Sequence, residues 1–275
     1  MYSFRHFINE KMMIFGKSSY PKFGNVVILA GGAGSGKGFQ KSNLLGIEGK
    51  SIDVDALKEL AVKSQKFAER VKAETGYDLK SFDMRKPENV SKLHEILSDV
   101  YNIVKGNERA LFASVLAAAP DRKPNLIFDV TLKSRSKLES ITRNVQELGY
   151  DKQNIHIVWV VNKIDVAIEQ NKNRSRVVPD EILMDTHEGA ALTMKNILDM
   201  GDGLKKYMDG TIYLSFNAVG VDTTLEKSKS GGKYVKDANY VKVKDQGKPQ
   251  MSSKEIGDDV YDKIKQYVPK IDGWA

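Results

Sequence analysis

The clearest chemical signal in the sequence is a glycine-rich loop with a lysine at its end. The loop reads Gly31-Gly32-Ala33-Gly34-Ser35-Gly36-Lys37; it directly follows the apolar run 26–30 and precedes a helical pattern. Glycines let the backbone curl so that successive N–H groups point into one concavity, to which the start of the helix adds positive potential. The lysine then reaches the β- and γ-phosphates of a nucleotide. This spacing predicts that residues 31–38 bind the phosphates of a nucleotide.

One position in this loop departs from the usual pattern. Gly38 stands where a Ser or Thr hydroxyl normally helps to hold Mg²⁺. Ser42 lies one turn further along and is too far down the helix to replace that hydroxyl. Mg²⁺ must therefore be held by other groups, through water, or weakly, and Gly38 counts against fast catalysis more than against nucleotide binding.

An acidic pair follows the short run 50–53. In the stretch Ile52-Asp53-Val54-Asp55, Asp55 opens a helical pattern. In kinases that use a phosphate loop, a carboxylate at this place can accept the proton of the attacking hydroxyl. An N-cap carboxylate is the structural alternative, and the two roles are compatible. We expect Asp55 to act as a catalytic base.

A third apolar run, 125–129, closes on a carboxylate. Asp129 would stand at the carboxyl edge of the sheet, where ligands gather in α/β proteins. It could hold the magnesium shell or a substrate hydroxyl. Thr131 and Lys133, on the loop that follows, would line the same crevice. We expect these three residues to bind substrate, with Asp129 also the metal ligand.

Two arginines occur between two helical patterns further along the chain. In Asn173-Arg174-Ser175-Arg176-Val177-Val178-Pro179, Arg174 and Arg176 lie just ahead of the proline that starts a helix. Guanidinium groups on such a loop can close over a polyphosphate and neutralise charge on a transferred phosphoryl group. Exposed arginines are more often merely solvated, but the phosphate loop favours a catalytic lid.

The elements that must position these residues follow an alternating order. Continuous apolar runs separated by stretches of 3.6-residue periodicity are typical of parallel strands joined by crossover helices, with both faces of the sheet covered. The predicted fold class is α/β, a doubly wound, mostly parallel sheet with flanking helices and an arginine-bearing lid. Strands are expected at 26–30, 50–53, 125–129, 155–161 and 211–216, with a hairpin strand at 234–243. Helices are expected at 55–75, 87–104, 108–119, 134–148, 164–173, 180–200 and 253–268.

Composition sets the broad class. The chain has 275 residues, a formal net charge of +7 and no cysteine, so disulfide frameworks and thiolate catalysis are excluded. No run approaches the roughly 20 apolar residues of a membrane span, which predicts a soluble protein without a membrane partner. The division expected is an N-terminal extension (1–24), a core (25–220) and a basic C-terminal appendage with a terminal helix (221–275). The basic appendage leaves nucleic acid open as a partner without favouring it.

Together these motifs resemble the zeta-toxin family of phosphate-loop kinases, relatives of polynucleotide and chloramphenicol kinases. The resemblance covers roughly 25–216 and rests on the glycine loop, the stretches 52–58, 125–131 and 161–164, and Arg176 ahead of Pro179. It implies ATP and Mg²⁺ as cofactors, Asp55 as general base, Lys37 and the lid arginines on the phosphoryl group, and the acceptor beside Asp129. It also leaves open an inhibitory partner of antitoxin type.

Two departures put the family's acceptor, UDP-N-acetylglucosamine, in doubt. Lys133 stands where the toxin has an arginine, and the helical pattern 108–119 lacks the carboxylate expected to grip an amino-sugar nucleotide. The acceptor hydroxyl could then belong to a nucleotide-sugar, a nucleoside or related small molecule, or a nucleic-acid end or base.

Two further motifs carry other hypotheses. Asn162-Lys163-Ile164-Asp165 matches the guanine-reading motif of GTPases, so a GTPase-like switch is one alternative, and a nucleotide-binding module that lost turnover through Gly38 is another. The first ten residues resemble the leader of T-even-type phage proteins destined for the capsid interior, which would be cut after Glu10. The structural alternative is an amphipathic helix that packs on the domain. The expected location is cytoplasmic, or a virion if the leader is real.

Overall fold

The computed structural model describes residues 13–16, 20–174, 177–227 and 233–270, without the side chains of 54–56, 87, 227, 233 and 234. Within these residues the fold is α/β, built on a seven-stranded sheet in the order β2-β3-β1-β4-β5-β7-β6. The first five strands in this order are parallel, and β7 and β6 extend the sheet antiparallel. The strands are β1 (Val26–Ala30), β2 (Lys50–Ile52), β3 (Leu126–Asp129), β4 (Ile155–Val161), β5 (Ile212–Phe216), β6 (Thr223–Lys227) and β7 (Lys233–Lys244).

The predicted doubly wound, mostly parallel sheet is confirmed, and all five expected parallel strands are present within one residue of their predicted ends. β4 is buried along its whole length, as continuous apolarity predicts for a central strand. β6 was not expected. Its residues are mostly polar, and it pairs at the sheet edge with β7 only, so it carries little apolar periodicity.

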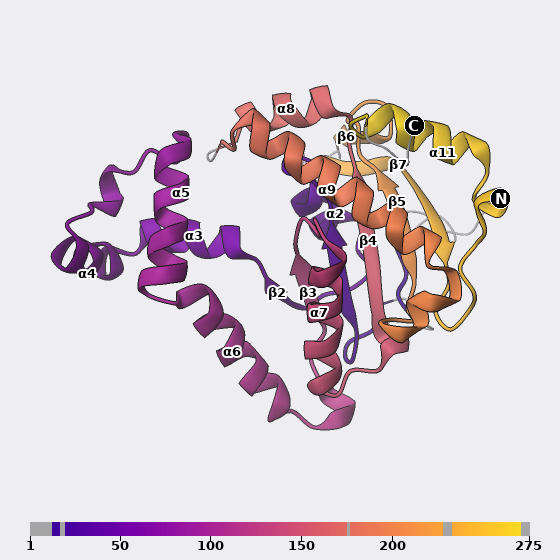
Figure 1. Ribbon diagram of the computed structural model, residues 1–275, viewed down its shortest axis with the longest axis horizontal. Coiled ribbons are helices and arrows are strands. Elements are labelled where there is room, and N and C mark those ends of the chain that lie inside the picture. The colour runs from indigo at the N-terminus through magenta and orange to yellow at the C-terminus, as the bar shows by residue number, and fades with distance from the viewer. Residues whose placement is uncertain (1–12, 17–19, 175–176, 228–232, 271–275) are drawn as a thin grey trace.

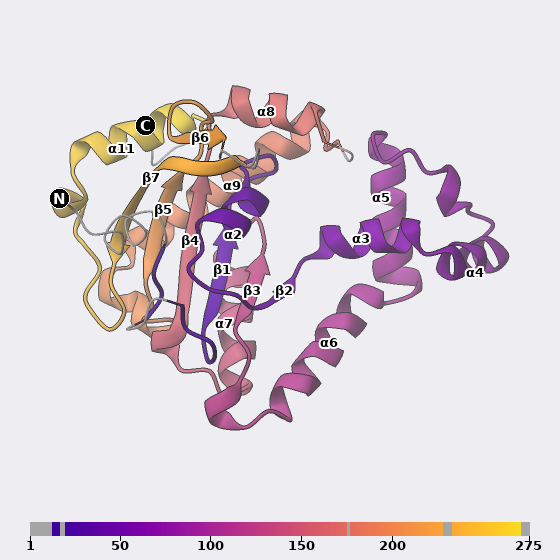
Figure 2. The same cartoon turned by 180° about the vertical axis from the view of Figure 1, so that it is seen from behind.

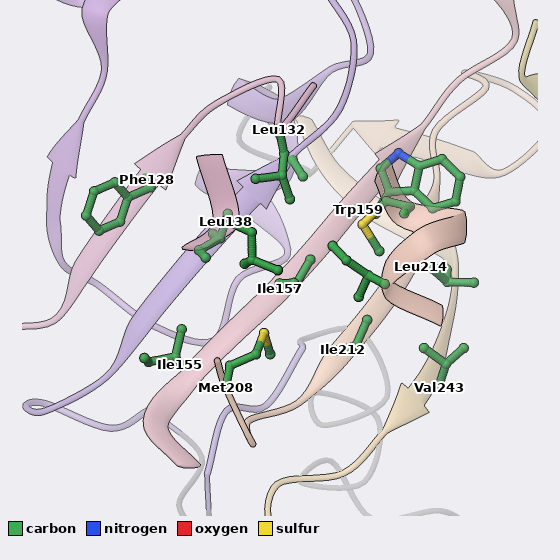
Figure 3. Close-up of a cluster of buried hydrophobic side chains, with 14 of the residues drawn as sticks. Phe128, Leu132, Leu138, Ile155, Ile157, Trp159, Met208, Ile212, Leu214 and Val243 are labelled. Atoms are coloured by element: carbon green, nitrogen blue, oxygen red, sulfur yellow. The ribbon is translucent and has the colours of Figure 1, made fainter. Parts of the chain in front are cut away.

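One face of the sheet packs against α7 (Arg135–Glu147), α9 (Asp180–Asp199) and α11 (Asp258–Tyr267). Figure 1 shows α7 and α9 lying across this face. Side chains from the central strands, among them Ile157 and Trp159, meet Leu138 of α7 there, and Val243 of β7 joins the same cluster (Figure 3). Alternate residues of β1, β3 and β4 point to the opposite face, so burying both sides requires a second cover.

The cover of the second face comes mainly from irregular chain. Met13 and Phe15 are fully buried there with Leu45 and Ile47, against Val27 and its neighbours on the strands. Phe15 makes edge-to-face contacts with Tyr213 and His156, and the Tyr213 hydroxyl donates to the carbonyl of Ile14 over 2.9 Å. Part of the expected N-terminal extension is thus core. Residues 1–12, including the expected leader and its cleavage point at Glu10, lie outside the described residues, and the leader stays a prediction.

The stretch between β2 and β3 forms a helical arm that projects from the sheet in both views (Figures 1 and 2). It contains α3 (Val54–Lys63), α4 (Gln65–Thr75), α5 (Pro87–Glu95), a short π-helical segment (Ile96–Val100) and α6 (Ile103–Leu116). A separate cluster around Val71, Leu79 and Leu93 holds the arm together.

Two expected helices of the arm are interrupted. The helix expected at 55–75 divides at Ser64, whose hydroxyl accepts the N–H of Phe67 and so caps α4. The helix expected at 87–104 ends where Asn102 adopts φ 52°, a left-handed conformation that asparagine tolerates. The following helix, expected at 108–119, therefore begins earlier, at Ile103.

Outside the arm, the helices lie close to their predicted ranges. α8 (Ile164–Lys172) and α9 flank the expected lid, and α7 starts after Ser134, whose hydroxyl accepts the N–H of Lys137. The glycine loop leads into a short helix, α2 (Lys37–Asn43). The terminal helix divides at Gly257 into α10 (Ser253–Ile256) and α11. Residues 221–275 contribute both strands β6 and β7, and α11 packs into the main core.

None of the helices that the structure describes is both long enough and apolar enough to cross a bilayer.

The buried position of Phe15 leads to a stability prediction. Phe15→Ala should lower the free energy of unfolding by about 3–5 kcal/mol, because it leaves a cavity between the sheet and the segment that covers it. Phe23→Ala, at a residue that is about half exposed, is the matched control and should cost far less. Urea denaturation of the full chain measures both, and equal losses would contradict the role assigned to Phe15.

Candidate nucleotide-binding site

The carboxyl ends of the parallel strands gather polar residues at one edge of the sheet. The glycine loop follows β1, Asp129 closes the neighbouring β3, and the register pairs Leu29 with Asp129. Ile52 pairs with Phe128, so Asp53 follows β2 at the level of Asp129. Asn217 follows β5 on the other side. This edge is where open α/β sheets bind ligands, because strand order reverses around β1.

The conformation of the loop requires its glycines. Gly34 and Gly36 have φ of 73° and 92°, a region that costs an L-residue with a Cβ roughly 1–2 kcal/mol. A Cβ at Gly34 would lie 2.5 Å from the carbonyl oxygen of Ala167 in α8, and a Cβ at Gly36 would collide with the Asn217 amide nitrogen. The backbone of the loop therefore lies in close contact with α8 and with the residue that follows β5.

Lys37 lies at the mouth of the loop. Its Nζ donates to the carbonyl oxygens of Gly31 and Gly32 over 2.9 and 3.2 Å, and it stands 3.9 Å from Asp129 Oδ1. Both side chains are largely buried, so this pair is less screened than a surface ion pair. The structure therefore brings together two of the residues that the sequence nominated separately.

Asn217 ties the loop to β5, and the sequence analysis did not nominate it. Its Nδ2 donates to the carbonyl of Ser35 over 2.9 Å, while its Oδ1 accepts from Gln40 of α2 and from Thr223. Gln40 also accepts the Ser215 hydroxyl. All these side chains are buried, so the network fixes the loop and α2 to the sheet. The available signal was a polar residue directly after an apolar strand.

A second unpredicted contact comes from α9. Thr186 and His187 are buried on the helix face that also carries Leu183 and Ala190, and both reach the backbone of Ala33. Burial and, second, the charge of Lys37 lower the pKa of His187, whereas its hydrogen bond to the Ala33 carbonyl opposes this shift. The signal in the sequence was two polar residues on an otherwise apolar helical stripe.

The loop after β3 holds the predicted acceptor-side residues. Leu132 is buried in the main core with φ 52°, an unusual conformation for a branched side chain, and it separates Thr131 from Lys133. Lys133 forms an ion pair with Asp185 of α9, and its stem lies against Gly189. Thr131 is half-buried close to the carboxyl edge. The loop thus faces α9, with Leu132 as its anchor.

The remaining nominated residues have mixed outcomes. α3 begins at Val54, so Asp55 is the second helical residue and not the N-cap residue that the sequence analysis considered. The side chain of Asp55 lies outside the described part of the structure, as does all of Arg176. Arg174 is exposed after α8, where its N–H donates to the carbonyl of Asn171 over 3.1 Å. Their catalytic roles stay predictions.

The site offers few oxygen ligands for a metal. Among the described residues, no group of three or more His, Cys, Asp or Glu side chains is arranged to hold an ion. Gly38 is exposed, and a Cβ there would meet nothing within 4 Å. The place that a Ser or Thr side chain would take is therefore open space. Asp129 beside Lys37 fits Mg²⁺ held by one carboxylate, phosphate oxygens and water, which is a common arrangement for this ion.

The residues that match the guanine-reading motif, 162–165, run from the end of β4 into α8. Asn162 is buried, with Nδ2 at 3.5 Å from Gln170 Oε1, and the Lys163 ammonium lies over the Tyr267 ring. Asp165 is exposed in the first turn of α8. Asn162 and Lys163 thus pack against other elements of the fold.

Comparison with known proteins gives a structural likeness only. No family model matches the chain, and no curated protein sequence matches it significantly. Among solved structures, it is similar to the AvrRxo1-ORF1:ORF2 complex with ATP, at 11% identity and a TM-score of 0.49 over 92% of this chain and 66% of that one. The same complex with sulphate ions matches at 13% identity and a TM-score of 0.49, over 88% of this chain and 63% of that one.

A structure of the PezAT chromosomal toxin–antitoxin system of Streptococcus pneumoniae matches at 13% identity and a TM-score of 0.39, over 79% of this chain and 72% of that one. The chain spans just under two thirds of the length of the matched chain in each of the two AvrRxo1-ORF1:ORF2 complexes. At these values the likeness assigns no residue role to this chain.

The two glycines at the end of the loop allow a matched test. Gly36→Ala should weaken ATP binding strongly, because φ 92° is strained for alanine and its Cβ displaces Asn217. Gly38→Ala, two residues further along in open space, should bind ATP like the wild type. Calorimetric titration with ATP measures both affinities, with melting temperatures as the folding control. Unchanged ATP binding by Gly36→Ala would contradict the close packing described here.

Proposed function

We propose that the chain is an ATP-dependent kinase of zeta-toxin type, which transfers the γ-phosphate to a hydroxyl of a nucleotide-sugar, a nucleoside or a related small molecule. The observation that carries the proposal is the placement of Lys37, within the curled glycine loop and 3.9 Å from Asp129, at the carboxyl edge of the sheet. A cation and a carboxylate beside a glycine loop that leads into a helix suit the terminal phosphates of a nucleotide.

The proposed roles follow from this geometry. Lys37 leaves the carbonyls of Gly31 and Gly32 for the β- and γ-phosphates, so its present partners mark the mouth of the binding concavity. Arg174 and Arg176 precede α9 in the chain and would neutralise charge on the transferred group. Asp129 would hold Mg²⁺ together with phosphate oxygens and water, and the ion supplies further charge neutralisation when bound.

In the transfer step, the acceptor oxygen forms a bond to the γ-phosphorus while the bond from that phosphorus to the β–γ bridging oxygen breaks, and ADP leaves. Asp55 takes the proton of the acceptor hydroxyl. It lies two residues beyond Asp53, which follows β2 at the level of Asp129. Thr131 and Lys133, on the loop after β3, are the proposed acceptor contacts.

The nature of the acceptor separates closely related possibilities. A polynucleotide or DNA-base kinase would use the same site with a nucleic-acid hydroxyl or base as acceptor. Several lysines of the basic appendage form ion pairs with neighbouring carboxylates: Lys236 pairs with Glu226, and Lys242 and Lys248 share Asp245. These pairs favour the small-molecule acceptor, because they leave less unpaired charge for a polyanion. An inhibitory antitoxin-like partner and packaging in a virion stay predictions.

Turnover is the direct test of the proposal. The full chain should transfer phosphate from ATP to at least one acceptor in a panel that includes nucleotide-sugars, nucleosides and DNA, and omission of Mg²⁺ should reduce the rate. Asp55→Asn should lower the rate by about 10²–10⁴-fold and spare ATP binding, because the amide cannot accept the proton. Mass spectrometry of the acceptors and calorimetry with ATP measure the two effects.

Asp165→Asn is the matched control, since Asp165 also lies in the first turn of a helix, and it should leave both ATP binding and transfer unchanged. A rate that survives in Asp55→Asn would exclude Asp55 as the base. A preference for GTP that disappears in Asp165→Asn would favour the GTPase-like switch over the kinase.

Gly38 favours one rival from a different class, a nucleotide-binding module without turnover, because the loop lacks the usual magnesium-side hydroxyl. Gly38→Ser should raise the rate of ATP turnover at low Mg²⁺, since a Cβ there meets nothing within 4 Å and the hydroxyl can join the metal shell. A Mg²⁺ titration of turnover, with Gly38→Ala as the control, measures the effect. Equal Mg²⁺ dependence in both variants would show that other groups hold the ion.

A further inference from the structure

Two consecutive residues of α9 bind both polar backbone groups of one residue of the phosphate loop. The N–H of Ala33 donates to Thr186 Oγ1 over 3.0 Å, and the carbonyl oxygen of Ala33 lies 2.8 Å from His187 Nε2. Both side chains are more than 90% buried. The two partners lie more than 150 residues from Ala33 in the chain, so only the tertiary fold brings them together.

The direction of each hydrogen bond is fixed by chemistry. A carbonyl oxygen can only accept, so His187 must carry its hydrogen on Nε2. The Thr186 hydroxyl accepts from Ala33 and donates its own hydrogen to the carbonyl of Leu183 over 2.7 Å. Neither side chain needs a charge for these bonds. The lowered pKa of His187 keeps the ring neutral at pH 7, beside the positive charge of Lys37.

The imidazole of His187 also bounds the loop sterically. A Cβ at Gly32 would collide with the ring atoms, so the backbone of the loop runs directly against the ring at this point. Ala33 is thereby held by a hydrogen bond on each side, while the residue before it is confined by contact. A loop so rich in glycine would otherwise have many accessible conformations, and ordering it on nucleotide binding would weaken affinity.

We propose that Thr186 and His187 are positioning residues that hold the Ala33 segment of the phosphate loop in its nucleotide-binding conformation before the nucleotide arrives. This inference rests on the proposed function, because it concerns the same loop. The two side chains act through the backbone of Ala33, and the phosphates are bound by other groups of the loop. The pair therefore controls ATP affinity more than the chemical step.

The two buried threonines of α9 provide a matched comparison. Thr186→Val removes the hydroxyl with little change in shape and should weaken ATP binding about 3- to 10-fold, as expected for one lost hydrogen bond. Thr193→Val makes the same change in the same helix at a threonine that is also buried, and should bind ATP like the wild type. His187→Leu should weaken binding similarly, whereas His187→Gln, whose amide can donate to the same carbonyl, should restore it.

Hydrogen exchange at the Ala33 amide gives a readout that does not depend on nucleotide. Exchange measured by NMR on the full chain without ATP should be faster in Thr186→Val than in the wild type and unchanged in Thr193→Val, because only the former removes the acceptor of that N–H. Melting temperatures of all four variants serve as the folding control.

The outcomes separate the two proposals. Wild-type chain that does not bind ATP in calorimetry would overturn the proposed function, and the positioning role with it. Wild-type binding together with unchanged affinity in Thr186→Val and His187→Leu would overturn the positioning role alone. Equal weakening in Thr193→Val, or failure of His187→Gln to bind more tightly than His187→Leu, would also overturn it, since either result would point to a general effect on α9.

Discussion

The arrangement of the candidate site depends on how closely the glycine loop packs against its surroundings. The backbone at Gly34 approaches the Ala167 carbonyl of α8, Gly36 approaches the Asn217 amide after β5, and Gly32 runs against the His187 ring of α9. Three elements from the second half of the chain therefore confine a loop near its beginning. In a close-packed interior, a Cβ at Gly34 would meet the backbone of α8, whereas a Cβ at Gly36 or Gly32 would displace the side chain of Asn217 or His187. The loop keeps its conformation only when the sheet is complete as far as β5.

Charge is distributed unevenly around this loop. Lys37 and Asp129 form a partly buried pair at its mouth, while Lys133, on the loop after β3, is paired with Asp185 of α9. Other cations, such as Lys72, Lys205 and Lys236, lie in exposed ion pairs that contribute little to stability. Lys244 is an exception, since it is buried and bonds to Asp209 and three backbone carbonyls.

The helical arm has an apolar core of its own. This core is separate from the core of the sheet. The first helix of the arm, α3, begins two residues after β2, and β2 is paired with β3 along its whole length. α3, whose second residue is Asp55, begins where the arm leaves the sheet (Figure 2). An arm with an independent core can keep its internal structure while its root adjusts.

The sequence by itself determined the local features. Continuous apolar runs marked the five parallel strands, the glycine spacing marked the tight loop after β1, and Asp129 lies at the predicted sheet edge because carboxyl ends of parallel strands share an edge. The break at Asn102 escaped prediction because the residues around it still follow a helical pattern.

Tertiary structure alone decided which distant groups hold the loop. Thr186, His187 and Asn217 reach it across more than 150 residues of chain, and hydrogen bonds to backbone atoms leave no distinctive spacing in a sequence. The sequence also did not predict the burial of Phe15, because any apolar segment that reaches the second face of the sheet could cover it. Periodicity and spacing report contacts within a few turns or strands, whereas packing between remote elements is determined only when the whole sheet has formed.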